Sequence, residues 1–247
     1  MVVANAVRVN GWAQISRDTV DVRMKMRNLF KWIMIFNFCW ITTAMSQTIP
    51  QVLERYGAAA QTRLQPWFER AAVPYPPQRL ALLGFKAEKA LELWAQQGKS
   101  WAWIRTYPIL AASGVAGPKL KEGDLQVPEG IYRINLLNPN SKFHLSMQID
   151  YPNTFDRLQA AGEQRTQLGG EIFIHGKAVS VGCLAMGDTA IEELFSLVAT
   201  VGMKKVKVII APQRNMQQVD VTQPSWLAEL YQQIRHELQP FQKLHSE

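Results

Sequence analysis

Three short apolar runs follow one another at hairpin spacing, and they constrain the fold more than any other feature of the chain. The runs occupy residues 79–86, 90–96 and 100–107, and the short stretches 87–89 and 97–99 separate them. Connections of this length join neighbouring antiparallel strands. The third run also alternates with a period of two residues, as a strand does. The sequence therefore predicts a β-meander.

Helical patterns flank the strands. Apolar residues recur every three or four positions over residues 49–70, which predicts an amphipathic helix or a helix pair ahead of a proline cluster. Thr189 and Glu192 fit a capping box that opens a helix reaching Val201, and residues 224–239 fit a last amphipathic helix. Further strands are predicted near 130–135 in a loop-rich region and at 143–150, 169–176 and 204–212. The fold class is a β-rich α+β domain with flanking N- and C-terminal helices.

These patterns divide the chain into four segments. The predicted divisions are an N-terminal region at 1–46, a helical segment at 47–78, a β-rich domain at 79–212 and a C-terminal helix at 213–247.

The positive charge of the chain is concentrated near its N-terminus. The 247 residues carry a formal charge of +7, from 27 basic and 20 acidic side chains. Residues 1–46 hold six of the basic and two of the acidic ones, which leaves 21 and 18, a net of +3, in the remainder. So small a net charge does not favour a nucleic-acid-binding protein.

A basic stretch, an apolar run and small residues follow one another before residue 47. The apolar run spans 32–41, and Ala44 and Ser46 occupy the −3 and −1 positions of a cleavage site. This is the order of a secretory signal, and the run is shorter than the roughly 20 apolar residues of a membrane span. We predict export, cleavage after Ser46 and membrane contact only through this segment. Residues 1–23 are unlike a signal, so Met24 is a candidate start; a buried N-terminal helix is the alternative.

Export makes Cys183 the only cysteine of the mature chain, because Cys39 lies within the signal. In an oxidising compartment a single cysteine cannot form an intramolecular disulfide. It indicates either a reactive thiol or a bridge to another molecule. An inert buried cysteine that packs as a small apolar side chain is the other possibility.

His175 ends a predicted strand eight residues before Cys183, and the connection contains Ser180 and Gly182. A thiol attacks a carbonyl as thiolate, so it needs a base or a positive neighbour. A connection that turns back would bring the imidazole within reach of the thiol. Backbone N–H groups of Gly182 and Cys183 are candidate oxyanion donors, and Gly182 would leave room for a substrate.

The sequence offers no set of metal ligands around this cysteine. A zinc site needs several Cys or His ligands, and no second cysteine or close histidine completes one. We expect no metal and no organic cofactor. His144, His236 and His245 are interpreted as ordinary surface or loop residues.

The segments IHG (174–176) and SVGCLAM (180–186) resemble the active-site motif of the L,D-transpeptidases, the YkuD-type catalytic domain. VPEGIY (127–132) is similar to a second motif of that family, and the resemblance covers residues 79–212. It implies a β-sandwich that carries the catalytic loop. It also implies Cys183 as nucleophile, His175 as general base and the Gly176 carbonyl as the group that orients the imidazole.

Two residues depart from the motif of most members. Val181 stands where most have histidine, and Ala185 stands where most have an arginine that grips substrate carboxylate. These departures, the short His-to-Cys connection and the segment DYPNTFDR (150–157) look like the YafK-like subgroup. That subgroup is associated with hydrolytic removal of lipoprotein from peptidoglycan. Arg157 first, and then Lys177, are candidates to replace the missing arginine, and Tyr151 is a further candidate for substrate binding.

The resemblance implies a periplasmic acyl-transfer enzyme that acts on peptidoglycan stem peptides. Cys183 would attack the L-centre carbonyl of meso-diaminopimelate, and an amine or water would resolve the thioester. A wall-linked lipoprotein is a second candidate partner. Two alternatives stay open: a non-catalytic peptidoglycan-binding or assembly protein with a degenerate site, and an exported cysteine protease of another fold.

Overall fold

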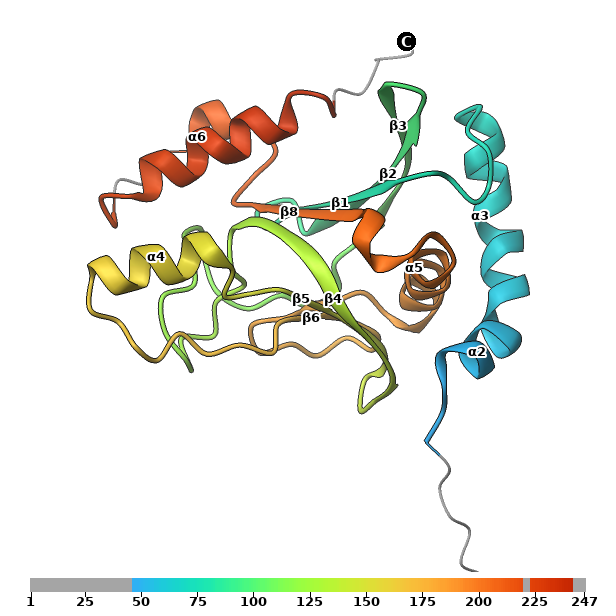
Figure 1. Ribbon diagram of the computed structural model, residues 1–247, viewed down its shortest axis with the longest axis horizontal. Helices are drawn as coiled ribbons and strands as arrows, with labels where there is room; N and C mark the ends of the chain where they lie inside the picture. The colour runs from blue at the N-terminus through green and yellow to red at the C-terminus, as the bar shows by residue number, and fades with distance from the viewer. Residues whose placement is uncertain (1–45, 220–222, 242–247) are drawn as a thin grey trace, which may run out of the picture. The chain divides into compact units, whose positions relative to one another are not determined.

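A mixed eight-stranded sheet is the framework of the structure, a computed structural model that describes residues 46–219 and 223–241 (Figure 1). The strand order is β3-β2-β1-β8-β4-β5-β6-β7. The strands are β1 (Leu80–Phe85), β2 (Ala90–Gln97), β3 (Ser100–Pro108), β4 (Gly130–Ser141), β5 (His144–Ile149), β6 (Phe173–His175), β7 (Leu184–Ala185) and β8 (Val206–Ala211).

The predicted meander is confirmed as three antiparallel strands, β1 to β3. The last strand in the chain, β8, lies inside the sheet, parallel to β1 and antiparallel to β4. Residues of β1 and β8 are buried at almost every position. Strands covered on both faces are uniformly apolar, which explains why these two runs lack clear alternation.

Strand β4 is longer than the predicted strand at 130–135. Its first residues pair with β8, and residues 134–141 pair with β5, with a register shift between Ile134 and Leu136. A bulge of this kind shifts the alternation of side chains by one residue. The residues beyond the bulge include an Asn-Pro-Asn sequence, which the pattern analysis interpreted as loop. One bent strand therefore joins the two halves of the sheet.

Helices cover both faces of the sheet. The N-terminal segment forms α2 (Ile49–Val52), the π-helix η1 (Leu53–Gly57) and α3 (Ala58–Arg70). The remaining helices are α4 (Thr154–Gly162), α5 (Asp188–Val201) and α6 (Leu227–Leu238), with 3-10 turns η2 (Met203–Lys205) and η3 (Met216–Gln218). The larger buried core includes residues of α3 and α5, and a second, smaller core includes residues of α6. Figure 1 accordingly shows α6 over one side of β1 and β8, and α5 on the other.

Two helix starts differ from the sequence expectation. The helix predicted from Thr189 begins at Asp188 with Gly187 as its N-cap, and no side chain caps it, so the predicted capping box is wrong. Glu192 instead pairs with Arg63. Helix α4 was not predicted, although Asn153 and Asp156 form a capping box at its start.

The predicted signal segment lies outside the described residues, except for Ser46. Within residues 46–219 and 223–241, no helix combines the length and hydropathy that a membrane crossing requires.

Candidate active site

The parallel pairing of β6 and β7 brings Cys183 beside the strand that ends in His175. Ile174 is opposite Leu184, and His175 is opposite Ala185. Cys183 therefore comes next to Phe173, whose backbone N–H lies 3.4 Å from its sulfur and donates to it. The two candidate catalytic residues lie on adjacent segments, two residues apart in register.

The His175 imidazole is held in one orientation. Its Nδ1 lies 2.6 Å from the carbonyl oxygen of Gly176, and the Phe143 ring packs against it with centroids 4.5 Å apart. A carbonyl oxygen can only accept a hydrogen bond, so Nδ1 carries the proton and Nε2 has the free lone pair. That tautomer is the one a general base at Nε2 requires.

Close packing at Gly176 excludes a side chain there. A Cβ at this position would come within 2.6 Å of the Phe143 carbonyl oxygen and 2.7 Å of an Asp188 carboxylate oxygen. Neither contact distance is found for real Cβ atoms. Only glycine lets the chain after His175 pass beneath the β4–β5 turn, so Gly176 shapes the site through its size.

Burial shifts the pKa values of both groups toward their neutral forms. Burial lowers the pKa of His175, while the contact with the Gly176 carbonyl opposes that shift. Burial raises the pKa of the Cys183 thiol above its usual value, against the Phe173 N–H and the Lys119 charge, which lower it. At neutral pH the resting site therefore holds a thiol and a neutral imidazole. A base must remove the thiol proton during attack.

Two serine hydroxyls hold the connection that precedes Cys183. The Gly182 N–H donates to Ser113 Oγ at 2.6 Å, and the Cys183 N–H donates to Ser180 Oγ at 3.0 Å. Ser180 Oγ in turn donates to the Cys183 carbonyl at 2.6 Å. Both candidate oxyanion donors are thus engaged by hydroxyls, which a developing oxyanion would have to displace. The sequence did not identify Ser113, which lies 69 positions from its partner.

A cavity of about 380 Å³ adjoins Gly182 and the flanking residue Val181. Lys119 and Glu171 are among the other residues that line it. Lys119 is only 8% exposed, and its Nζ lies 2.6 Å from an oxygen of Asp124. It is a cation whose charge acts on the Cys183 thiol. Nothing in the local sequence pattern singled out this lysine.

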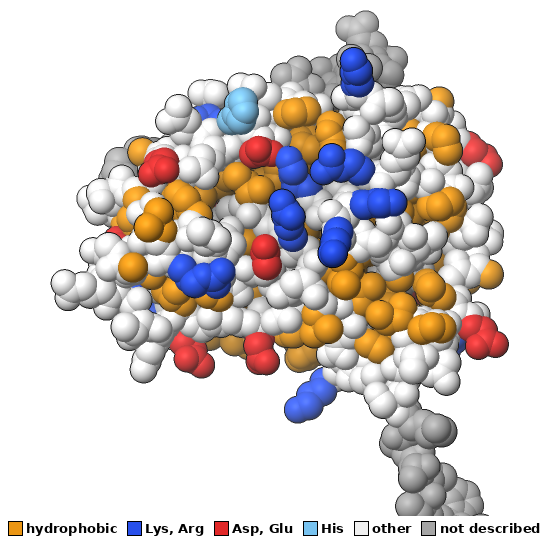
Figure 2. Space-filling view, viewed as in Figure 1, with side chains coloured by type: hydrophobic (Ala, Val, Ile, Leu, Met, Phe, Trp, Pro, Cys, Tyr) orange, Lys and Arg blue, Asp and Glu red, His pale blue; other side chains and the backbone are white. Residues whose placement is uncertain are grey.

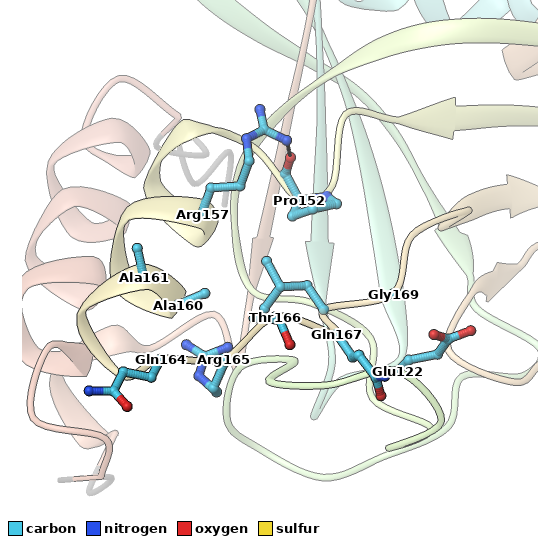
Figure 3. Close-up of a pocket in the computed structure, with 11 residues that line it drawn as sticks. Glu122, Pro152, Arg157, Ala160, Ala161, Gln164, Arg165, Thr166, Gln167 and Gly169 are labelled. Atoms are coloured by element: carbon cyan, nitrogen blue, oxygen red, sulfur yellow. Dashed lines mark hydrogen bonds between the residues drawn. The ribbon is translucent and has the colours of Figure 1, made fainter.

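The structure does not bring Arg157 together with Cys183. Arg157 is exposed on α4, donates to the Pro152 carbonyl and lines a separate cavity of about 700 Å³ (Figure 3). Glu122 and Gly169 line this cavity and also the one beside Cys183. Their backbones pack closely, because a Cβ on Gly169 would lie 3.2 Å from Glu122 Cα. The two cavities therefore adjoin at these two residues.

The other two substrate-binding candidates are held by backbone groups. Tyr151 is 5% exposed, and its hydroxyl lies 3.3 and 3.2 Å from the carbonyl oxygens of Lys119 and Leu168. Lys177 is exposed, and its Nζ donates to the Lys142 carbonyl at 2.9 Å. Both assignments stay predictions, and Tyr151 is placed as part of the core.

The other histidines lie apart from Cys183 or outside the described residues. His144 Nε2 lies 3.0 Å from a Glu192 oxygen, so this residue joins β5 to α5 and is not a plain surface residue. His236 belongs to α6, and His245 lies outside the described residues. No group of three or more His, Cys, Asp or Glu in the described part of the chain is arranged to hold a metal ion.

A family model described as the YkuD L,D-transpeptidase catalytic domain matches residues 85–210, just over half of the 247 residues. The chain belongs to this L,D-transpeptidase family. The resemblance carried by the IHG and SVGCLAM motifs is thereby confirmed, and so is the expected α+β fold with flanking helices.

Relatives of this L,D-transpeptidase-family chain extend the comparison. YafK of Escherichia coli (strain K12), a protein named for the same family, is 37% identical over 135 residues, which are 53% of this chain and 52% of the relative. The chain thus matches about half the length of that curated relative.

Among solved structures, the helical cell shape determining protein Pgp2 of Campylobacter jejuni is 22% identical, with 61% of this chain and 56% of that chain covered and a TM-score of 0.46. Bd1075 of Bdellovibrio bacteriovorus is 21% identical, with 67% and 57% covered and a TM-score of 0.40.

Proposed function

We propose that this chain is a cysteine acyl-transfer enzyme of the cell envelope that acts on peptidoglycan stem peptides. The observation that carries the proposal is the pairing of β6 with β7, which sets Cys183 beside the strand of His175, whose Nδ1 is held by the Gly176 carbonyl. Family membership supports the substrate class. The scissile carbonyl is that on the L-centre of meso-diaminopimelate.

The reaction takes two steps through a thioester. In the first, Nε2 of His175 accepts the thiol proton as Cys183 Sγ bonds to the carbonyl carbon. The imidazolium then gives this proton to the leaving amine as the C–N bond breaks, and the acyl group remains on sulfur. In the second, an acceptor amine or water loses a proton to His175 as it attacks the carbonyl. The C–S bond breaks, and the thiolate recovers the proton.

Water is the acceptor that the sequence departures favour, and hydrolysis would release wall-linked lipoprotein. Ala185 supplies no cation beside Cys183, and the curated relative that shares 37% identity is YafK, the namesake of the subgroup whose motifs this chain resembles. An amine acceptor would instead form cross-links. The substrate lies outside the cytoplasm, so the proposal includes export to the periplasm through the segment that precedes Gln47.

The second candidate function is a peptidoglycan-binding protein without catalysis. The raised pKa of the Cys183 thiol, which burial causes, favours it, as does Val181, which is 73% exposed in place of the usual histidine. Labelling with a carbapenem followed by mass spectrometry separates the two functions. An adduct on Cys183 that is missing from His175→Ala supports an activated thiol.

Muropeptide analysis tests the proposal itself. Lipoprotein-bearing sacculi are incubated with the wild type and with Cys183→Ala, and the released muropeptides are separated by chromatography and identified by mass spectrometry. Loss of lipoprotein remnants with the wild type alone indicates hydrolysis, and new diaminopimelate–diaminopimelate cross-links indicate transpeptidation. Identical products from both proteins would contradict the proposal.

A further inference from the structure

Basic residues from several elements surround a cavity where β8 begins. The cavity has a volume of about 360 Å³, and Arg79, Arg133, Lys204 and Lys207 line it together with Asp150 and Glu237. We call the four basic residues and this cavity the basic hollow. Figure 2 shows Lys and Arg side chains gathered over the middle of the molecule, where Figure 1 places β4 and the start of β8.

The sheet register sets like charges against each other in the basic hollow. Arg133 on β4 is the direct register partner of Lys207 on β8. Leu80 is opposite Val206 in the parallel β1–β8 pair, and Arg79, one residue before Leu80, lines the same cavity. Like charges directly opposite on neighbouring strands destabilise a sheet. The fold does not need this arrangement, and a bound anion would relieve it.

Acidic neighbours neutralise the basic hollow only in part. Lys207 forms an ion pair with Glu237, and an Asp150 oxygen accepts the backbone N–H of Arg133 at 2.8 Å. Within residues 46–219 and 223–241, Arg79, Arg133 and Lys204 form no ion pair, and all three are exposed. The six charged side chains that line the cavity, four basic and two acidic, carry a net charge of +2.

The basic hollow shares a sheet face with His175. Arg133 lies between two residues of the larger core, and Ser146 lies between two others, so both point to the opposite face. Ser146 is the register partner of His175. From β4 the strand order continues β5-β6-β7, which puts the Cys183 segment three strand spacings, about 14 Å, across the sheet. An extended peptide spans that distance with about four residues.

We propose that the basic hollow binds a carboxylate of the wall peptide, several residues away from the bond at Cys183. The inference rests on the proposed function for the identity of the ligand. Arginine presents parallel N–H groups that match a carboxylate. Arg79 lines the hollow from the segment just before β1, and Arg133 lines it from β4. Peptidoglycan stem peptides carry free carboxylates along their length, so a second anchor point would align the peptide across the face that carries His175.

The test measures binding in the absence of turnover. The full chain with Cys183→Ala is titrated with soluble stem-peptide fragments and, in parallel, with the same fragments after amidation of their carboxyl groups. The double substitution Arg79→Gln with Arg133→Gln removes two charges from the hollow. Lys99→Gln is the matched control, because Lys99 is exposed on the turn between β2 and β3. Thermal melting of each variant verifies that it is folded.

We expect the double variant to bind the free-carboxyl fragment at least about tenfold more weakly, a change of about 1.4 kcal/mol, because it loses two charged hydrogen-bond donors to the carboxylate. Lys99→Gln should change affinity less than twofold, and amidation should abolish the difference between the proteins. Equal affinities for the double variant and Lys99→Gln would overturn the inference. The inference would also be overturned if Lys99→Gln still bound the amidated fragment more tightly than the double variant by the same factor. Because turnover is not measured, failure of the acyl-transfer proposal would show separately, as identical sacculus products from the wild type and Cys183→Ala.

Discussion

The contact between α3 and α5 differs from the loop before Cys183 in how its polar groups are satisfied. In the helix contact, buried Glu193 pairs with Arg63 and Arg105 at 2.8 Å each and also accepts from Tyr107. In the loop, serine hydroxyls hold backbone groups, Gly182 adopts a left-handed φ of 86° and Val181 is exposed. The first region is closed by long-range ion pairs. The second opens onto a cavity, so a substrate can approach it, although hydroxyls already accept from its backbone N–H groups.

Removing the sulfur should have the largest effect on function and almost none on stability. Cys183→Ala should lower kcat/KM for stem-peptide cleavage by at least about 10⁴-fold, as loss of a covalent nucleophile does. Its melting temperature should stay within a few degrees of the wild type. If Cys183→Ala still cleaved the stem peptide, the loop before Cys183 would not differ from the helix contact in its role in catalysis.

Glu193→Gln should show the reverse pattern. The substitution leaves two arginines without their shared carboxylate, and breaking a buried ion pair costs about 3–5 kcal/mol. Partial exposure of both arginines, 33% and 24% for their side chains, puts the expected loss at the lower end, about 3 kcal/mol. Denaturant unfolding measures it, with exposed Glu54→Gln as the control. A loss no greater than that of the control would show that the helix contact depends on apolar packing alone.

The serine hydroxyls allow a finer separation of the two regions. Ser113→Ala removes the acceptor of the Gly182 N–H and should cost about 1 kcal/mol of stability, while kcat/KM falls about tenfold because the loop before Cys183 loses its shape. Ser180→Ala should behave similarly. Steady-state kinetics and thermal melting on the same samples compare the loss of kcat/KM with the loss of stability. A loss of stability without loss of activity would mean that the hydroxyls only support the fold.

The pH dependence should report the burial of His175. The free base must be neutral to accept the thiol proton, so kcat/KM rises with pH through the pKa of His175. Burial lowers that pKa below the usual value of 6.5, so the acid limb should have its midpoint below 6.5. Removing the covering ring with Phe143→Ala should raise the midpoint, as solvent reaches the imidazole. A midpoint that falls or stays the same in Phe143→Ala would show that burial does not lower the pKa of His175.

Local patterns predicted the parts of this molecule that depend on neighbours in the chain. Alternation and turn spacing revealed the meander, and the helices at 49–70 and 227–238 followed from periodicity. Strand β4 was underestimated because the bulge after Ile134 breaks the alternation. Helix α4 was missed, although Asn153 and Asp156 carried its cap signal.

The candidate site divides in the same way. The motif residues are close in sequence, so Cys183, His175 and Gly176 could be named from it. Ser113 and Lys119 reach the same place from a loop that precedes Cys183 by 70 and 64 residues, and only the fold brings them there. The direction of the Cys183 pKa shift depends on burial, which no local pattern records. The sequence suggested a thiol activated by its neighbours, whereas burial favours the neutral thiol at rest.

The central claim is a covalent thioester on Cys183, and rapid quenching followed by intact-protein mass spectrometry tests it most directly. A stem peptide that contains meso-diaminopimelate is mixed with the wild type, and the reaction is stopped in acid at successive times. The account predicts a transient mass increase equal to the acyl fragment, mapped by digestion to Cys183 and strongly reduced in His175→Ala. Cleavage of the peptide without any adduct, together with equal cleavage by Cys183→Ala, would contradict it.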